Sequence, residues 1–558
     1  MRNFIKNGAK ILTQAQNSIL SAAAIMMIAV FASRLLGLFR NRLLAQFFTP
    51  DQLGVYFAAF RIPDFIFSIL VMGALSTAFI PVITSLIAQK KQSEIWRVSS
   101  ITLNIGLIVF FILSIFVFIF AYPISTLIVP GFTPSQTLLV AKLTQIMLIG
   151  QFFFIISNFL TGILQSYKRF LIPAFAPVAY NIGIILGIIL FTNSLGIFAP
   201  AVGVVIGTFL HFFIQIPLAK KLGLSYKFDL DYKNPYVRKI GRLMLPRTLS
   251  LGASQLNYTI DNILASLISA SAITVFNFAQ QLQQLPIGLF GATIAQAALP
   301  TFSESLAKNN VKEFQKNLIS CFHQISYLVL PSSVILIILR IPLVRLVFGA
   351  ARFDWDSTLL TAMTLGILSL GLFAQSQIYL LARGFFALSD TKTPLFTGLV
   401  SVIVNISISS LLILYFHFPV WGLAIASSTA DLLYASILLI LLDKKTGGFD
   451  KNALLTPFFK ILLATFIMSL TLYFPMKFLD NYILDTTKTI NLIILTVTVT
   501  LASSLLFYFL SKLLHISQAQ SFEKLIAKMT STLKHLFTKP PTPFEPPPAE
   551  QQQPSPTV

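Results

Sequence analysis

Five arginines stand inside long apolar stretches of this 558-residue chain. A charged side chain costs about 3 kcal/mol to insert into a bilayer, so such residues are functional by default. Arg34 and Arg40 are six residues apart and would point about 120° away from each other on a helix. Arginines in a dry cavity suit an anion, most naturally a phosphate or diphosphate. We predict that Arg34, Arg40, Arg61 and Arg247 bind substrate. For Arg42 and Arg247, near the ends of apolar stretches, snorkelling to headgroups is the alternative.

The second apolar stretch combines charge with helix-bending residues. Arg61 and Asp64 have the i, i+3 spacing of an intrahelical ion pair, and Pro63 between them would bend the helix. Proline removes a backbone hydrogen bond, and glycine permits bending and close packing. We predict hinge positions at Pro63, Gly73, Pro81 and Gly291, with merely tolerated kinks as the alternative.

Composition and motifs point to a membrane transporter rather than an enzyme. The chain is 56% hydrophobic and 11% charged, whereas soluble domains are about 25% charged. Cys321 is the single cysteine, which excludes a disulfide framework. No GxxxxGK[ST] loop is present, so ATP is not the direct energy source. The FDWD stretch at Asp354 and Asp356 is better explained as a helix N-cap than as a catalytic pair.

Fourteen apolar stretches are long enough to cross a bilayer as helices. We therefore expect an all-α integral membrane protein with 14 transmembrane helices, near 18–39, 53–88, 98–127, 138–165, 172–193, 196–218, 242–268, 274–303, 314–339, 357–388, 394–416, 419–442, 455–477 and 489–511. With both termini in the cytoplasm, 28 of the 40 basic residues fall in cytoplasmic segments and 6 in outer loops. This bias follows the positive-inside rule. It explains the net charge of +21 by topology, without nucleic acid as a partner.

Two parts of the chain look duplicated. The segment GALSTAFIPVITSL resembles GATIAQAALPTFSESL, which matches Pro81 with Pro300, and a second pair of similar segments matches Pro173 with Pro394 at nearly the same offset. Because six helices per copy is an even number, both copies would have the same orientation. We expect two six-helix lobes related by a pseudo-twofold axis along the membrane normal, plus two extra C-terminal helices. Two such lobes are typical of an alternating-access transporter.

The spans and the flanking composition divide the chain into seven parts. We expect a cytoplasmic amphipathic N-terminus (1–17), an N-lobe (18–218), a basic cytoplasmic linker (219–241), a C-lobe (242–442), two further spans (455–511), a basic cytoplasmic segment (512–538) and a disordered proline-rich tail (539–558).

Three motifs resemble the MurJ (MviN) family of lipid II flippases, within the multidrug/oligosaccharidyl-lipid/polysaccharide exporter superfamily. They are ASRLLGLFRNRLLAQFF, FAAFRIPDFIFSILVMGALSTAFIPV and LARGFFALSDTKTP. The resemblance implies a flippase that moves the undecaprenyl-diphosphate-linked peptidoglycan precursor from the inner to the outer leaflet of the bacterial cytoplasmic membrane. It also implies a central cavity whose arginines hold the diphosphate, and a groove for the lipid tail in spans 13 and 14.

The sequence departs from the family at several charged positions. Phe67 and Ser68 replace arginines, Gln280 and Gln281 replace an acidic–arginine pair, and Gly54 replaces an acidic residue. Glutamine still hydrogen-bonds sugars and phosphates, so Gln280 and Gln281 stay among the predicted substrate-binding residues.

The resemblance also implies a cation site, because some relatives bind sodium in the second lobe. Here the matching residues are Asp261, Asn405, Ser409 and Thr429. A carboxylate with neutral oxygens suits a hard cation. The alternative is that Asp261 bonds to neighbouring amides, no cofactor is bound, and the membrane potential drives transport.

Two other functions stay open. One keeps the fold and changes the cargo, to another polyprenyl-linked glycan or a small cationic drug. The other is a non-transporting membrane scaffold for cell-wall synthesis, which would recruit partner proteins through the tail. We expect a monomer whose substrate is a lipid-linked glycan.

Overall fold

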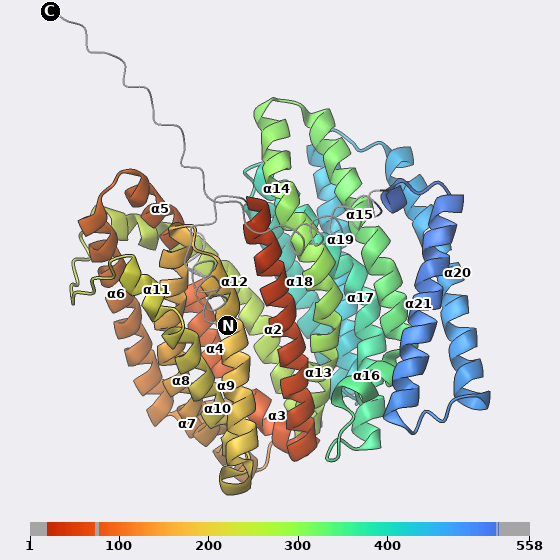
Figure 1. Ribbon diagram of the computed structural model, residues 1–558, viewed down its shortest axis with the longest axis horizontal. Helices are drawn as coiled ribbons and strands as arrows, with labels where there is room; N and C mark the ends of the chain where they lie inside the picture. Colours follow the sequence, from red (N-terminus) through yellow and green to blue (C-terminus); the bar gives the residue numbers. More distant parts are fainter. Residues whose placement is uncertain (1–18, 73–77, 521–522, 524–558) are drawn as a thin grey trace, which may run out of the picture.

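A computed structural model of the chain describes residues 19–72, 78–520 and 523. The described part is helical throughout (Figure 1). The first half contains α2 (Ile19–Phe47), α3 (Pro50–Ala59), α4 (Arg61–Phe67), the π-helix η1 (Ser68–Met72), α5 (Ile80–Ala88), α6 (Gln92–Ile119), α7 (Ala121–Ile128), α8 (Pro134–Ser166), α9 (Leu171–Leu195), α10 (Phe198–Phe213) and α11 (Ile216–Lys221).

The second half repeats this order and adds two helices. It contains α12 (Pro235–Ile268), α13 (Ala270–Pro286), the π-helix η3 (Ile287–Gly291), α14 (Ala292–Ala307), α15 (Val311–Ile338), α16 (Arg340–Phe348), α17 (Trp355–Ala387), α18 (Lys392–Ser410), the π-helix η4 (Leu411–Tyr415), α19 (Trp421–Lys445), α20 (Lys451–Tyr482) and α21 (Thr489–Leu513).

The long helices of the two halves match in order. Helices α6 and α15 have the same length, and so do α8 and α17, and each pair is separated by nearly the same stretch of chain. Even the π-helix η1 recurs, as η3, at the offset that relates α6 to α15. A single-turn π-helix is rare and is found at functional sites. Its occurrence at the same place in both halves fits two lobes built on one plan.

Local sequence sets the helix ends. Thr49 and Thr133 each form a capping box with the glutamine three residues on, and a proline occupies the first helical position of α3 and of α8. Asp354 caps α17 by accepting from Ser357 N at 3.4 Å, which confirms the N-cap interpretation.

Twelve helices in the described part are long and apolar enough to cross a membrane. Two further long helices, α2 and α12, lie where the first and seventh spans were predicted, but they are not among the twelve. Both carry several arginines. The all-helical, multi-span membrane fold is confirmed, while the count of fourteen stays a prediction.

The linker between the lobes is bound to the side of α6. Arg97 donates to Asp229 at 3.0 Å and to Asp231 at 3.1 Å, and Asn104 donates to the carbonyls of Lys227 and Asp229. The hydrogen bond from Arg97 lowers the pKa of Asp229 below its usual value. These contacts attach the predicted linker to the N-lobe.

The last two helices form a separate layer beside the C-lobe. In Figure 1, α20 and α21 lie at the edge of the molecule, where α20 packs on α15 and α21 contacts α16. Lys460, a charge within α20, donates to the carbonyl of Leu514 at 3.1 Å. That bond to a helix-end carbonyl accounts for a lysine in an apolar span.

Several predicted features lie outside the described residues. They are the amphipathic N-terminus, the proline-rich tail, most of the basic segment 512–538, and Gly73.

Candidate functional site

The two predicted substrate-binding arginines of α2, Arg34 and Arg40, point in different directions. Arg34 is exposed and faces η3 of the other lobe, since a Cβ added at Gly288 would lie 3.5 Å from its Nη2. Arg40 instead donates to Asn181 of α9 at 3.1 Å. It therefore points within its own lobe and not toward the second lobe. Their six-residue spacing puts them on different faces of the helix, as the sequence indicated.

Arg61 bridges the lobes rather than pairing with Asp64. Its Nε donates to Asn262 of α12 at 3.4 Å, and its Nη2 donates to Asn277 of α13 at 3.3 Å. Asp64 accepts from Gln151 at 3.4 Å, and the ion pairs within 4.0 Å in the described part of the chain do not include Arg61 with Asp64. The predicted intrahelical pair is therefore wrong. Asparagine oxygens from the second lobe satisfy the guanidinium in its place.

Gln281 makes a second polar contact between the lobes. Its Oε1 accepts from Nδ2 of Asn41, a fully buried residue of α2. Gln280, one residue earlier, lines a small pocket with Arg61. Arg247 lies within α12, but its side chain is outside the described part of the chain.

The lobes meet backbone to backbone where α3 packs on α13. A Cβ at Gly54 would lie 1.8 Å from the carbonyl oxygen of Ala270. Nearby, Thr274 Oγ1 donates to Pro50 O at 2.6 Å, and Ser271 N donates to Asp51 Oδ1 at 2.9 Å. This closed end lies at the bottom of Figure 1, the end that the positive-inside rule assigns to the outside.

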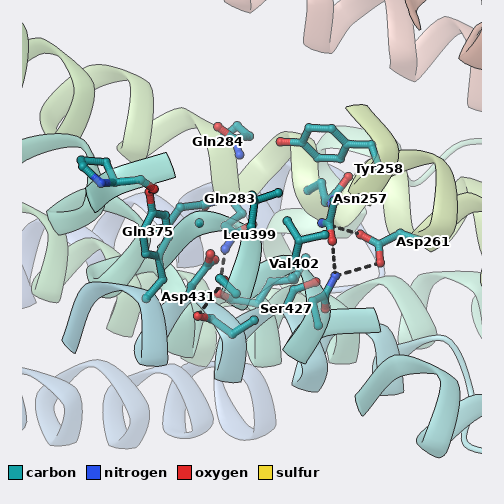
Figure 2. Close-up of a pocket in the computed structure, with 18 of the residues that line it drawn as sticks. Asn257, Tyr258, Asp261, Gln283, Gln284, Gln375, Leu399, Val402, Ser427 and Asp431 are labelled. Carbon is teal, nitrogen blue, oxygen red and sulfur yellow. Dashed lines mark hydrogen bonds between the residues drawn. The ribbon is translucent and has the colours of Figure 1, made fainter. Parts of the chain in front are cut away.

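A cavity of about 230 Å³ lies inside the C-lobe, among α12, α13, α17, α18 and α19. Its lining holds two carboxylates, Asp261 and Asp431, which Figure 2 shows in different parts of the wall. Amides and hydroxyls supply most of the remaining polar lining: Asn257, Tyr258, Gln280, Gln283, Gln284, Gln375, Ser401, Asn405, Ser427 and Tyr434. An acidic wall with many neutral oxygens suits a cation.

The structure brings together part of the predicted sodium set. Asp261 accepts from Asn405 at 3.1 Å, and Asn405 also donates to Asn257 at 2.9 Å (Figure 2). Ser409 is buried one turn from Asn405 and donates to its Oδ1 at 3.4 Å. Thr429, however, is exposed, its hydroxyl donates to the carbonyl of Ile425, and it does not line the cavity.

Asp431 was not in the predicted cation set although it lies in the same cavity. An acidic residue in the middle of the apolar stretch 419–442 was the visible signal. Its place in the same cavity as Asp261 could not be predicted, because it depends on how α19 packs against α17 and α18.

The comparisons with known proteins agree with this architecture. The family model described as "Lipid II flippase MurJ" matches residues 44–493. The chain belongs to this family. A probable lipid II flippase MurJ of Buchnera aphidicola subsp. Acyrthosiphon pisum is 28% identical over 79% of this chain and 87% of its own length. The lipid II flippase MurJ of Burkholderia cenocepacia is 27% identical, over 70% of this chain and 76% of its own length.

A solved structure of the lipid II flippase MurJ in an inward closed conformation has a TM-score of 0.72 at 26% identity. The match covers 87% of this chain and 99% of that one. An inward-facing transporter of the MATE family, in the MOP superfamily, has a TM-score of 0.62 at 16% identity and shares the fold. These matches place the chain among MurJ-family transporters, as the motifs indicated.

The positions at which charges of the MurJ family are replaced lie on facing elements. Gly54 packs on the backbone of α13, the helix that carries Gln280 and Gln281. Gly54 contacts α13 at its first residue, Ala270, whereas Gln280 and Gln281 lie ten and eleven residues further along the helix. The replaced positions are therefore about 15 Å apart along α13 and do not face each other.

The predicted hinge residues have different surroundings. Pro63 is buried in α4, Pro81 is exposed in the first turn of α5, and Gly291 ends η3. A Cβ at Gly291 would lie 2.8 Å from the Cβ and 3.0 Å from the Cα of Ser376 in α17. Close helix packing therefore already requires this glycine.

We predict that Gly291→Ala lowers the stability of the protein by about 2 kcal/mol, because overpacking forces η3 and α17 apart. Gly288→Ala is the matched control in the same π-helix, since its Cβ would make only an ordinary 3.5 Å contact. Thermal unfolding in detergent checks the difference. Equal melting temperatures with impaired transport for Gly291→Ala would favour the hinge interpretation instead.

Proposed function

We propose that this chain flips the undecaprenyl-diphosphate-linked peptidoglycan precursor from the inner to the outer leaflet of the bacterial cytoplasmic membrane. Arg34 carries the proposal. It is an exposed guanidinium in an apolar helix, directed across the lobe contact toward η3. A guanidinium in that position can bind a diphosphate through bidentate hydrogen bonds and release it when the lobes separate. The protein acts as a monomer with both termini in the cytoplasm.

Complementation of a cell depleted of its own lipid II flippase tests this function. Rescue by the chain lacking residues 539–558, with loss of rescue on Arg34→Ala, supports transport. Rescue that requires the tail but tolerates Arg34→Ala would instead favour a scaffold that recruits cell-wall synthesis proteins.

The C-lobe cavity supplies a site for a coupling cation. Asp261 with Asn405 and Asn257 forms a carboxylate–amide set that fits sodium, while Thr429 does not fit because its hydroxyl is used within its own helix. Asp431 supplies a second carboxylate to the wall. When bound, the cation would neutralise this wall. Asp261 also lines the small pocket that contains Arg61, so its charge lies next to the contact between the lobes.

We predict that flipping in proteoliposomes slows when sodium is replaced by choline, and that Asp261→Asn removes the difference. Removing the charge of one carboxylate ligand weakens cation binding by about 2 kcal/mol, which lowers the cation affinity roughly thirtyfold. Asp431→Asn is expected to weaken the sodium dependence as well. Thr429→Val is the control and is expected to leave it unchanged. Equal rates in both salts would contradict cation coupling and leave the membrane potential as the driving force.

A further inference from the structure

Four arginines belong to segments at the end of the C-lobe that we assign to the outside. Arg42 ends the charged stretch of α2, Arg340 and Arg345 belong to α16, and Arg352 lies in the loop before α17. The positive-inside rule disfavours basic residues on that side. Their presence there therefore requires a separate explanation.

The internal repeat shows that the fold does not need these charges. The N-lobe counterpart of α16 is α7, which follows α6 as α16 follows α15 and is similarly short. At matching positions the N-lobe has Ala121 for Arg340, Thr126 for Arg345 and Gly131 for Arg352. The same architecture is thus built without arginine in one lobe and with three in the other.

Backbone carbonyls accept hydrogen bonds from three of these arginines, among them Arg340, whose Nη1 donates to Ile337 O at 2.7 Å. Arg42 Nη1 donates to Leu346 O at 2.7 Å, and Arg345 Nη2 donates to Thr486 O at 2.9 Å. Across the described residues, none of the four has a carboxylate oxygen within 4.0 Å. A guanidinium has five N–H groups, so one carbonyl leaves most of them for another acceptor.

The surroundings place this cluster at the level of lipid headgroups. Arg345 lies 5.8 Å from the ring centre of Trp355, a 53%-exposed tryptophan, and tryptophan is enriched at membrane interfaces. Helix α16 contacts both α2 and α21, which connects the cluster to the helix of Arg34 and to the last two spans (Figure 1). At that level, a lipid headgroup can reach the arginines.

We propose that Arg42, Arg345 and Arg352 form an outer receiving site for a lipid-linked diphosphate, the group that arrives once the cargo has crossed. Several guanidiniums with no carboxylate among them match a multiply charged diphosphate better than the single charge of a phosphodiester headgroup. This inference rests on the proposed flippase function and adds a second phosphate site to it, separate from Arg34.

Fluorescence of Trp355 tests the site directly. The full chain with Trp96→Phe and Trp421→Phe keeps Trp355 as its single tryptophan and is placed in phosphatidylcholine nanodiscs. Farnesyl diphosphate is expected to give a saturable change in emission, because it draws Arg345 away from the ring. Arg352→Gln, which removes an exposed residue, is expected to weaken this binding about tenfold, the effect of one charge-assisted hydrogen bond.

Matched variants separate this site from its alternatives. Lys142→Gln removes an exposed basic residue on the outer side of the N-lobe and is expected to leave the titration unchanged. Arg34→Ala is also expected to retain the Trp355 response even where it abolishes flipping, so failure of the receiving site and failure of the flippase function are distinguishable. A titration unaffected by Arg352→Gln, or lost with Arg34→Ala, would overturn the proposal. An equal response to phosphatidylglycerol would also overturn it, by assigning the site to phospholipid headgroups.

Discussion

Arg34→Ala is expected to reduce lipid II flipping in proteoliposomes by at least about a hundredfold. Two charge-assisted hydrogen bonds to a diphosphate are together worth about 3 kcal/mol or more, and alanine removes both. Arg34→Lys is expected to recover part of the activity, because an ammonium supplies the charge without the planar fork of a guanidinium. The measurement is the rate at which a labelled precursor becomes accessible on the opposite leaflet.

The same helix offers a control for this variant. Leu35→Ala changes a side chain that is 51% exposed, one residue away, and is expected to flip at the normal rate. Unchanged thermal unfolding of Arg34→Ala would show that the loss is functional, since the exposed guanidinium makes no packing contact comparable to a core residue. Flipping at the normal rate in Arg34→Ala would exclude this arginine as the diphosphate ligand.

Gly54→Val is expected to open the closed end of the transporter. Its Cβ would lie 1.8 Å from the carbonyl oxygen of Ala270, and this backbone cannot move without separating α3 from α13. Overpacking of this kind destabilises the closed state by about 3 kcal/mol. The equilibrium between the closed and open outer end would then shift roughly a hundredfold toward the open state. We expect lower flipping and a larger population with the outer end open.

A cysteine reporter makes the opening measurable. In a Cys321→Ser background, Asn277→Cys places a thiol at the lobe contact beside Arg61. Faster labelling by a membrane-impermeant maleimide is expected with Gly54→Val. The control is Gly241→Val in α12, where an added Cβ meets nothing within 4 Å. Equal labelling rates in the two valine variants would show that the contact of Gly54 with Ala270 does not keep the outer end closed.

The sequence by itself determined the class of the protein and most of its elements. Apolar stretches of bilayer length and the asymmetry of basic residues predicted a multi-span helical protein. In a bilayer the backbone groups must hydrogen-bond within the protein, and a helix satisfies all of them within one segment. The repeated proline and glycine patterns predicted the duplication. Capping residues such as Thr49, Thr133 and Asp354 marked helix starts, since these signals act over a single helical turn. Motifs around Arg34 and Gly73 indicated the family.

Only the tertiary structure decided which polar groups meet. Spacing allowed Arg61 to pair with Asp64, yet asparagines of the second lobe bind it, because the lobe contact brings them closer. Asp431 lines the same cavity as Asp261, and Thr429 points away from it, according to how α19 is rotated against α17 and α18. Helical periodicity fixes the relative directions of side chains on one helix but not the rotation of that helix against its neighbours. Close backbone packing sets such rotations, as where Gly371 of α17 approaches Ser428 of α19, and therefore decides which side chains line the C-lobe cavity.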